Sequence, residues 1–281
     1  MSMKILACSD DATLAAEVQG KASEFGEVVA LDGSNLPDQD SSTIAAAIAS
    51  IAESQGCDLV FLGATKLGKD VAPRVAALLD VPYAAEVSEL GHGEHGFTAS
   101  RMVLSGNSKA SYVLGAKAVV TATPKTFEAT GAATTSATAD VPASNVQVLG
   151  TVGKGDSDFD LSAAAYVVGV GRGFKAQADI KLAEELAGKL PGGAVGCSRP
   201  VAADLKWLGE EHWIGLSGHE IKPKVYFAAG VSGQIQHVAG IRGSKIIVAI
   251  NTNKDAPIFQ IADYGIVGDL YDVLPKLTAA L

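Results

Sequence analysis

Short apolar runs alternate with amphipathic segments along the first half of the chain. The apolar runs predict strands, and the amphipathic segments, two of which carry apolar residues at helical spacing, predict helices. Strands are expected at 4–8, 28–31, 59–62, 111–120 and 146–152, and helices at 12–25, 42–54 and 70–79. Such alternation is typical of a mainly parallel sheet with helices on its faces.

The pattern breaks twice and then restarts in the second half of the chain. The small-residue stretch 129–140, ATGAATTSATAD, predicts a flexible loop, and the polar stretch 153–160, GKGDSDFD, is the best domain boundary. Beyond it, strands are expected at 163–170, 194–197, 225–229 and 245–250, and helices at 176–190 and 271–281. We therefore predict an α/β fold of two domains, 1–160 and 161–281, each a mainly parallel sheet with flanking helices.

Composition and charge narrow the classes of function. The chain has 281 residues, of which 48% are hydrophobic, so a sizeable core is available. A formal charge of −9 and the lack of any basic run argue against a nucleic-acid partner. No apolar run approaches the ~18 residues that a spanning helix needs, so no membrane insertion is expected.

The N-terminus and the cysteines predict a compartment. A predicted strand begins close to the N-terminus, and the N-terminal residues show no signal-peptide pattern. Cys8, Cys57 and Cys197 are far apart and form no Cys-x-x-Cys or Cys/His pattern, so neither a metal site nor a disulfide framework is expected. A reducing bacterial or archaeal cytoplasm fits best, and the mitochondrial matrix is the weaker alternative because no transit peptide is seen.

The stretch 225–269 is the most informative for function. It holds two buried-strand runs that end in small or polar residues, the first at Ser232-Gly233-Gln234 and the second at Asn251. Polar groups at the carboxyl ends of parallel strands are where open α/β sheets bind ligands. A helix starting near Gln234 would aim free backbone N–H groups at a phosphate, with His237 about one turn in. The stretch predicts a site for a nucleotide-like cofactor.

Three further motifs are ambiguous on local grounds. Gly169-Val170-Gly171-Arg172-Gly173 is either a tight turn that places Arg172 near a phosphate or flavin, or a simple turn with a surface arginine. Cys197-Ser198-Arg199-Pro200 offers a hydroxyl and a fixed cation, but a helix-capping serine beside a solvated arginine explains it better. In 214–219, IGLSGH, glycines flank a hydroxyl, a pattern that turns share with ligand loops.

Two classes of function could use a nucleotide-like cofactor site. An NAD-dependent dehydrogenase needs a glycine fingerprint followed ~20 residues on by an acidic residue, and that pattern is absent. A nucleotide-binding module without redox activity is an interpretation that the N-terminal domain alone supports. No Ser/His/Asp arrangement or carboxylate pair indicates hydrolysis.

Several sequence segments in the C-terminal half resemble those of one known family. GVSGQIQHVAG, KIIVAIN and DAPIFQIADYGIVGD, with GVGRGFK and CSRP upstream, resemble the C-terminal signature of the electron transfer flavoprotein α subunit, over about 45 ungapped positions in 225–269. The segments 68–80, GKDVAPRVAALLD, and 101–107, RMVLSGN, resemble family segments more loosely. The Ser-Arg-Pro sequence also resembles that of a nitrogen-fixation-type branch of this family.

The resemblance implies a function and partners. The C-terminal domain would be Rossmann-like and bind one FAD, and the N-terminal domain would pack against a β subunit. The heterodimer would act as an electron carrier, accepting electrons from flavin dehydrogenases such as the acyl-CoA dehydrogenases of fatty acid β-oxidation. It would pass them to a quinone oxidoreductase or another acceptor. An electron-bifurcating flavoprotein complex is the alternative within the family.

The resemblance also implies roles for sixteen residues. Those expected along the pyrophosphate, ribityl and flavin positions are Ser232, Gly233, Gln234, Ile235, Gln236 and His237. Those expected around the adenosine half are Asn251, Asp269 and Leu270. Arg172 and Ser198 would complete the site, and Arg199 would lie against the isoalloxazine. Ile214, Gly215, Leu216 and Ser217 would approach the reactive ring edge, with the Ser217 hydroxyl on flavin N5.

Two aspects of this site concern redox tuning. Many family members read Gln-Thr-Gly-Lys where this chain has Leu216-Ser217-Gly218-His219, so the hydroxyl is kept and the Gln and Lys are lost. Arg199 and His237 are the candidate cations beside the flavin. Two unit charges ~4 Å apart at an effective dielectric of ~20 interact by ~4 kcal/mol. For a one-electron step, this energy corresponds to a shift in the flavin reduction potential of at most roughly 170 mV.

Overall fold

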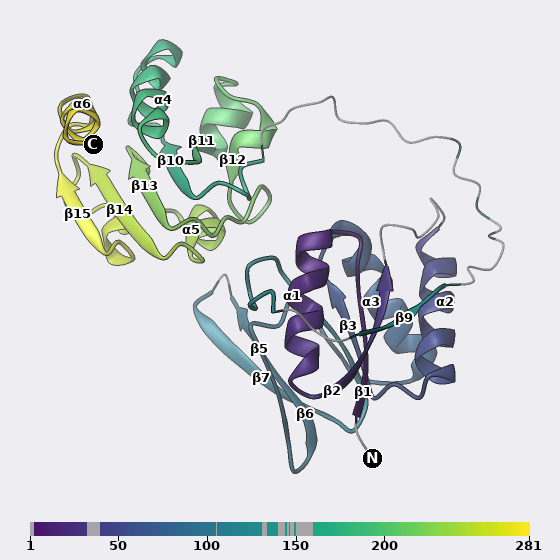
Figure 1. Ribbon diagram of the computed structural model, residues 1–281. Helices are drawn as coiled ribbons and strands as arrows, with labels where there is room; N and C mark the ends of the chain where they lie inside the picture. The colour runs from purple at the N-terminus through teal and green to yellow at the C-terminus, as the bar shows by residue number, and fades with distance from the viewer. Residues whose placement is uncertain are drawn as a thin grey trace. The chain divides into compact units, whose positions relative to one another are not determined.

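The computed structural model describes residues 3–32, 40–104, 106–130, 134–139, 144, 146, 149 and 160–281. The chain divides into two compact units, Met1–Val152 and Gly153–Leu281, which we call the N-terminal and C-terminal units (Figure 1). The predicted boundary stretch 153–160 lies, apart from Asp160, outside the described residues, so its exact position stays a prediction.

The N-terminal unit is built on a parallel sheet of six described strands in the order β4-β8-β3-β1-β2-β9. The strands are β1 (Met3–Ser9), β2 (Gly26–Asp32), β3 (Leu59–Gly63), β4 (Tyr83–Ala84), β8 (Ala118–Ala122) and β9 (Thr134–Ala137). The helices are α1 (Ala12–Ser23), α2 (Ser41–Ser54) and α3 (Lys66–Leu79). Every residue of β3 and β8 is buried, because helices cover both faces of the sheet.

Alternate residues of β1 enter two separate cores. Ile5 and Ala7 pack with α1 on one face, whereas Leu6 and Cys8 pack with α2 and α3 on the other. This alternation follows from the strand period of two, with apolar residues on both faces. The mainly parallel α/β sheet expected from the sequence is confirmed.

Several sequence-based expectations for this unit need correction. The stretch 129–140 is not simply a loop, because β9 pairs in parallel with β2 as the edge strand of the sheet. Thr is enriched in strands but Ala is depleted, so pairing with β2 rather than strand propensity alone explains this strand. The run 111–120 is two strands, β7 (Ser108–Gly115) and β8, rather than one. The strand expected at 146–152 falls almost wholly outside the described residues.

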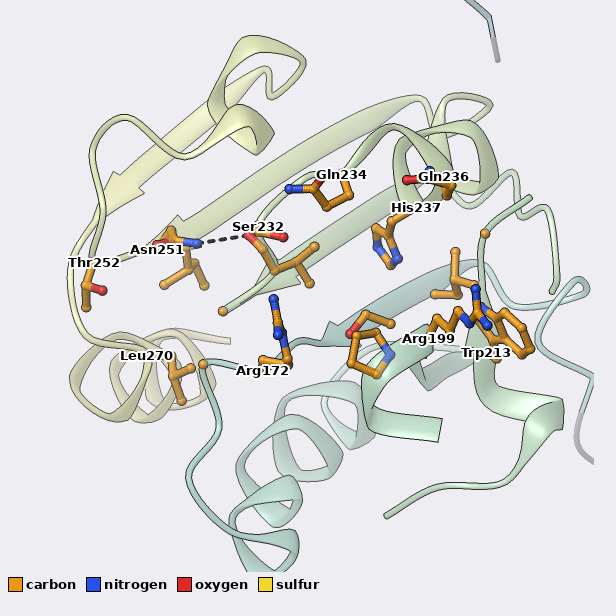
Figure 2. Close-up of a pocket in the computed structure, with 18 of the residues that line it drawn as sticks. Arg172, Arg199, Trp213, Ser232, Gln234, Gln236, His237, Asn251, Thr252 and Leu270 are labelled. Carbon is orange, nitrogen blue, oxygen red and sulfur yellow. Dashed lines mark hydrogen bonds between the residues drawn. The ribbon is translucent and has the colours of Figure 1, made fainter. Parts of the chain in front are cut away.

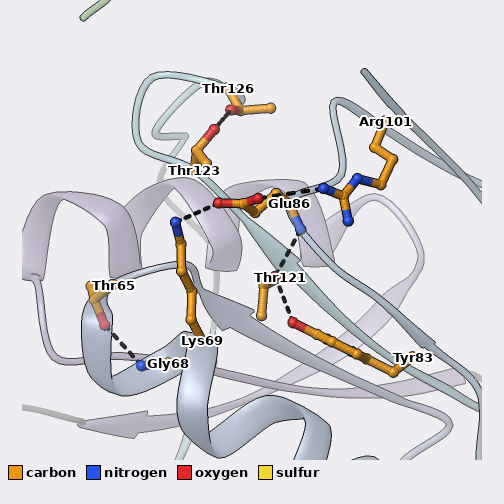
Figure 3. A network of polar contacts seen from close by, with 9 residues as sticks. All are labelled: Thr65, Gly68, Lys69, Tyr83, Glu86, Arg101, Thr121, Thr123 and Thr126. Atoms are coloured by element: carbon orange, nitrogen blue, oxygen red, sulfur yellow. Dashed lines mark hydrogen bonds and ion pairs between the residues drawn. The ribbon is translucent and has the colours of Figure 1, made fainter. Parts of the chain in front are cut away.

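The sequence pattern also missed a second, antiparallel sheet. It has the order β5-β6-β7, with β5 (Glu89–Gly93) and β6 (Gly96–Val103). Glu86, in the left-handed conformation with φ 53°, ties this sheet to the parallel one (Figure 3). Its carboxylate pairs with Lys69 of α3 and, at 3.5 Å, with Arg101 of β6, and its N–H donates to Thr121 Oγ1 of β8 at 2.8 Å.

The C-terminal unit contains a second parallel sheet in the described residues, with the order β12-β11-β10-β13-β14-β15. Its strands are β10 (Tyr166–Val170), β11 (Gly193–Ser198), β12 (Trp213–Ile214), β13 (Val225–Ala229), β14 (Ile246–Asn251) and β15 (Tyr264–Val267). Numbered within this unit, the order is 3-2-1-4-5-6, that of doubly wound dinucleotide-binding sheets. The order reverses between β10 and β13, which defines the switch point.

Helices cover both faces of this sheet. Helices α4 (Lys181–Gly188) and α6 (Leu270–Ala280) pack on one face, and α5 (Ile235–Ile241) packs on the other (Figure 1). The helix expected at 176–190 is a short turn, Gln177–Ile180, followed by α4. Of the helices in the described residues, none is long and apolar enough to cross a membrane.

Candidate functional site

A cavity of about 620 Å³ opens at the carboxyl ends of the C-terminal sheet. All six strands contribute to its lining, each through the last residues of the strand or the loop that follows it (Figure 2). Ligands of open α/β sheets bind outside these strand ends at the switch point. The volume lies within the range of small-molecule and cofactor sites, roughly 300–1,000 Å³.

Glycines allow two loops to meet at the switch point. The loop after β10 and the loop after β13 approach backbone to backbone, with the Gly173 N–H donating to the Gly230 carbonyl at 3.0 Å. A Cβ on Gly171 would lie 2.1 Å from that carbonyl oxygen, and Gly230 itself has φ 63°. The GVGRG motif is therefore a close-packing device, and it places Arg172 on the cavity wall.

Fourteen of the sixteen predicted site residues line this cavity. They are Arg172, Ser198, Arg199, Ile214, Gly215, Leu216, Ser217, Ser232, Gln234, Gln236, His237, Asn251, Asp269 and Leu270. Gly233 and Ile235 do not line it. A Cβ on Gly233 (φ 84°) would lie 2.3 Å from the Ile258 nitrogen, so this glycine serves a tight backbone approach, and Ile235 is 46% exposed. The roles of all sixteen toward a ligand stay predictions.

The sequence reasoning missed other lining residues. They are Gly173, Lys175, Pro200, Trp213, Gly230, Val231, Ile250, Thr252 and Gly268. Each lies within a few residues of a strand end that the fold brings to this edge. Trp213 belongs to the two-residue strand β12, which the pattern did not predict. A search of every strand end for lining residues would have found most of them.

The cavity carries positive charge in an acidic chain. Its lining includes three cationic side chains, Arg172, Lys175 and Arg199, and one carboxylate, Asp269. The whole chain has 31 acidic and 22 basic residues, so this local excess runs against the composition. A cleft with one sign of charge raises the local concentration of ligands of the opposite sign. The electrostatics favour an anionic ligand.

Arg199 is placed by an aromatic neighbour. Its guanidinium lies 5.6 Å from the centre of a Trp213 ring, and Figure 2 shows the two side chains together at one end of the cavity. A guanidinium is planar and stacks on aromatic faces, so Trp213 pre-orients it. Ser198, just before it, is buried at the end of β11.

His237 does not fit the prediction of a second cation. It is buried on α5, and its Nε2 lies 2.8 Å from the Tyr226 hydroxyl. Burial lowers the pKa of His237 to about 4, and a backbone contact with Ile214 only partly opposes this shift. That contact lacks the geometry of a hydrogen bond, since Nδ1 is buried without a partner among the described residues. The ring is neutral at neutral pH, so Arg199 is the better candidate for charge stabilisation.

Asn251 and Asp269 already hold the backbone around the cavity. The Asn251 amide donates to the Val231 carbonyl at 2.9 Å, joining the ends of β14 and β13, and its oxygen accepts from Asn253 N–H. The Asp269 carboxylate caps α6 by accepting from the Tyr271 N–H at 3.0 Å. These two residues shape the half of the cavity predicted for adenosine, whatever contacts they add with a ligand.

The 214–219 loop packs on α5 as well as facing the cavity. The Leu216 N–H donates to the Gln236 carbonyl at 2.8 Å, and a Cβ on Gly240 would lie 2.6 Å from the Gly215 nitrogen. The glycines therefore permit close approach to the helix. Leu216 and Ser217 are exposed at the cavity rim.

These features fit a flavin dinucleotide. The cavity spans the switch point, a surplus of cations can face a pyrophosphate, and an aromatic-backed guanidinium stands at one end. The buried His237 Nδ1 is a hydrogen-bonding group that none of the described residues satisfies.

Comparison with known proteins identifies the family. The model of the electron transfer flavoprotein domain matches residues 5–149, and the model of the electron transfer flavoprotein FAD-binding domain matches residues 160–242. FixB from Escherichia coli (strain 55989 / EAEC) is 39% identical over 245 residues, which cover 84% of this chain and 78% of that protein. YdiR from Escherichia coli (strain K12), named as an electron transfer flavoprotein subunit, is 38% identical over 250 residues, covering 86% and 80%. The chain belongs to the electron transfer flavoprotein family and is an α-subunit-type member of it.

Proposed function

We propose that this chain is the FAD-binding α subunit of a heterodimeric electron transfer flavoprotein. The observation that carries the proposal is the cationic cavity at the switch point of a 3-2-1-4-5-6 sheet, inside the unit that matches a FAD-binding family model. We assign this unit the Rossmann-like fold that the resemblance implies, and the strand order 3-2-1-4-5-6 supports the assignment.

The proposed binding mode uses the two halves of the sheet separately. Arg172 and the Ser232–His237 segment hold the pyrophosphate and ribityl chain, because they flank the switch point. Asn251, Asp269 and Leu270 hold the adenosine half beyond β14 and β15. Arg199 and Ser198, with the 214–217 loop, hold the isoalloxazine beyond β11 and β12.

The bound flavin supplies the electron transfer, and the chain positions and tunes it. Arg199 is held by Trp213 to place a fixed cation against the ring. The exposed Ser217 hydroxyl is available at the ring edge, as the hydrogen-bond donor proposed for N5. The exposed Leu216 at the same rim leaves an apolar surface where many family members carry Gln.

The partners follow from the family. The N-terminal unit packs against a β subunit, and the heterodimer accepts electrons from a flavin dehydrogenase, such as an acyl-CoA dehydrogenase of fatty acid β-oxidation. It delivers them to a quinone oxidoreductase or another acceptor in the cytoplasm. The similarity to FixB supports a place in the nitrogen-fixation-type branch.

The direct test is co-purification with the β subunit followed by a visible spectrum and a flavin count. We expect flavin bands and one FAD per heterodimer, released intact on denaturation. Two FAD per heterodimer would support the electron-bifurcating alternative. A colourless heterodimer that takes up no added FAD would contradict the proposal.

A further inference from the structure

Tyr226 stands behind His237 without lining the cavity. It lies on β13, is fully buried, and its ring crosses β10 above Gly169. A Cβ on Gly169 would lie 1.9 Å from the Tyr226 hydroxyl oxygen, so the glycine leaves the room that this phenol occupies. The hydroxyl reaches His237 Nε2 at 2.8 Å. The pair joins the middle of the sheet to the cavity wall.

The direction of this hydrogen bond follows because the buried Tyr226 O–H needs an acceptor. Burial raises the pKa of Tyr226 above its usual value, so the phenol keeps its proton. Within the described residues, His237 is the only hydrogen-bond partner of this hydroxyl. A buried O–H without an acceptor costs about 1–3 kcal/mol, so the phenol donates and Nε2 accepts. A neutral imidazole has one N–H, which then sits on Nδ1.

The consequence is a buried donor that no described residue satisfies fully. The Ile214 backbone contacts the ring without hydrogen-bond geometry, Nδ1 has no hydrogen-bond partner in the described part of the chain, and the ring belongs to the cavity lining. Figure 2 shows the His237 ring turned toward the space between Arg172 and Arg199. A donor at this position is complementary to an acceptor atom of a ligand, such as a flavin carbonyl oxygen or ring nitrogen.

We propose that Tyr226 is a positioning residue that fixes the orientation and tautomer of His237, so that Nδ1 carries the proton and is held as a donor for the bound flavin. The inference rests on the proposed FAD site for the identity of the ligand. The pairing of Tyr226 with His237 is a property of the protein alone.

The test is Tyr226→Phe in the heterodimer, which keeps the ring that fills the space above Gly169 and removes the hydroxyl. Tyr166→Phe is the matched control, because Tyr166 begins the neighbouring strand β10, is half-buried and does not line the cavity. The first readout is ¹⁵N NMR of the imidazole nitrogens without FAD. We expect a protonated Nδ1 and an unprotonated Nε2 in the native protein and a mixture of tautomers in Tyr226→Phe.

The second readout is the dissociation constant and the reduction potential of FAD. Loss of one neutral hydrogen bond predicts about fivefold weaker FAD binding for Tyr226→Phe and a lower potential, with neither changed in Tyr166→Phe. In a His237→Ala background, Tyr226→Phe should add no further change in affinity, because the pair is already broken.

Two outcomes would overturn the inference. One is an imidazole tautomer that is the same in Tyr226→Phe and native protein. The other is a fivefold affinity loss that persists in the His237→Ala background, which would make Tyr226 a general packing residue. Failure of the proposed function looks different, because the native heterodimer would then bind no FAD while the tautomer measurement still reported on the pair.

Discussion

The two units share one architecture and differ at the same place, the carboxyl ends of their strands. In the C-terminal unit the strand ends and the loops that follow them line a cavity of about 620 Å³ with three cationic side chains. In the N-terminal unit the hollow at the β1/β3 reversal has a volume of only about 20 Å³. A parallel sheet supplies the position for a site, and the loops decide whether a site exists.

The N-terminal unit closes this edge with its own side chains. Thr65 Oγ1 donates to Asp10 Oδ1 at 2.5 Å across the switch point, and Gly63 is so close to Ser9 that a Cβ would lie 2.3 Å from its hydroxyl. After β8, the buried Glu17 carboxylate accepts from the N–H groups of Lys125 at 2.8 Å and Thr126 at 3.1 Å. A carboxylate of the chain thus occupies backbone donors that in an open loop could face a phosphate.

The largest expected effect comes from breaking the switch point of the C-terminal unit. Gly230→Ala places a Cβ 2.8 Å from Gly173 Cα at φ 63°, so both backbone strain and overlap oppose folding. We expect at least about 3 kcal/mol of destabilisation and loss of bound flavin. Urea unfolding followed by tryptophan fluorescence measures this unit alone, because both tryptophans, Trp207 and Trp213, lie in it.

Gly192→Ala is the matched control for this variant. Gly192 has φ 68°, but the nearest atom to its Cβ position is 3.7 Å away. We expect Gly192→Ala to lower the free energy of unfolding by about 1 kcal/mol, because of backbone strain, and to retain the bound flavin. Equal destabilisation by the two variants would show that the loop approach at the switch point is not what holds the cavity open.

Replacing Arg199 should shift the flavin most among the cavity side chains. Arg199→Ala removes the cation beside the ring and should lower the reduction potential, by at most roughly 170 mV. Arg199→Lys keeps the charge but not the planar stacking on Trp213, so its shift should be smaller. Spectroelectrochemistry of the heterodimer measures both, and an unchanged potential in Arg199→Ala would contradict the assigned role.

Glu17→Gln tests how the N-terminal unit closes its loops. The variant weakens the charge-assisted hydrogen bonds from the Lys125–Phe127 backbone to residue 17. We expect the free energy of unfolding to fall by about 1–2 kcal/mol and the amide hydrogens of this segment to exchange faster. The flavin content should not change, because the effect is confined to this unit. Glu24→Gln, an exposed carboxylate paired with Lys21, is the control and should cost under about 0.5 kcal/mol. Equal exchange rates in both variants would contradict the closing role of Glu17.

The smallest expected effect is that of Ser217→Ala. The side chain is exposed, so stability should not change, and only a hydrogen bond to the flavin is lost. A bond of about 1 kcal/mol corresponds to a shift of roughly 20–40 mV. Ser217→Thr should keep the native potential, and a shift as large for Thr as for Ala would indicate that shape at the rim matters more than the hydroxyl.

Local periodicity predicted most of the strands and helices but failed where pairing is long-range. The strand 225–229 was predicted with the bounds that the structure has, since five apolar residues between turn signals are typical of a buried strand. The edge strand β9, inside ATGAATTSATAD, was missed because its small residues pair with β2 about 106 positions away, as Thr134 does with Val28. The antiparallel β5-β6-β7 sheet is different, because its strands pair locally through short turns, as Gly93 does with Gly96. It was missed because β5 and β7 expose most of their residues and so lack a strong apolar pattern.

The candidate site was predicted in large part by resemblance and strand-end position, and corrected by packing. Ser198 and Asn251 each follow an expected strand, and the family resemblance assigned both of them to the ligand. Gly233 was assigned to the ligand, although its close neighbour is Ile258. His237 was assigned a charge, which no local pattern can decide, because burial and the Tyr226 hydroxyl control its protonation.

By itself, the sequence determined that two parallel α/β units alternate along the chain, that the second resembles an electron transfer flavoprotein α subunit, and that polar residues follow its strands. Only the tertiary structure decided the strand order, the meeting of the β10 and β13 loops at glycines, the closure of the N-terminal edge and the neutrality of His237. The physical reason is range. Periodicity and turn residues act over a few positions, whereas strand order, loop approach and desolvation depend on residues far apart in the chain.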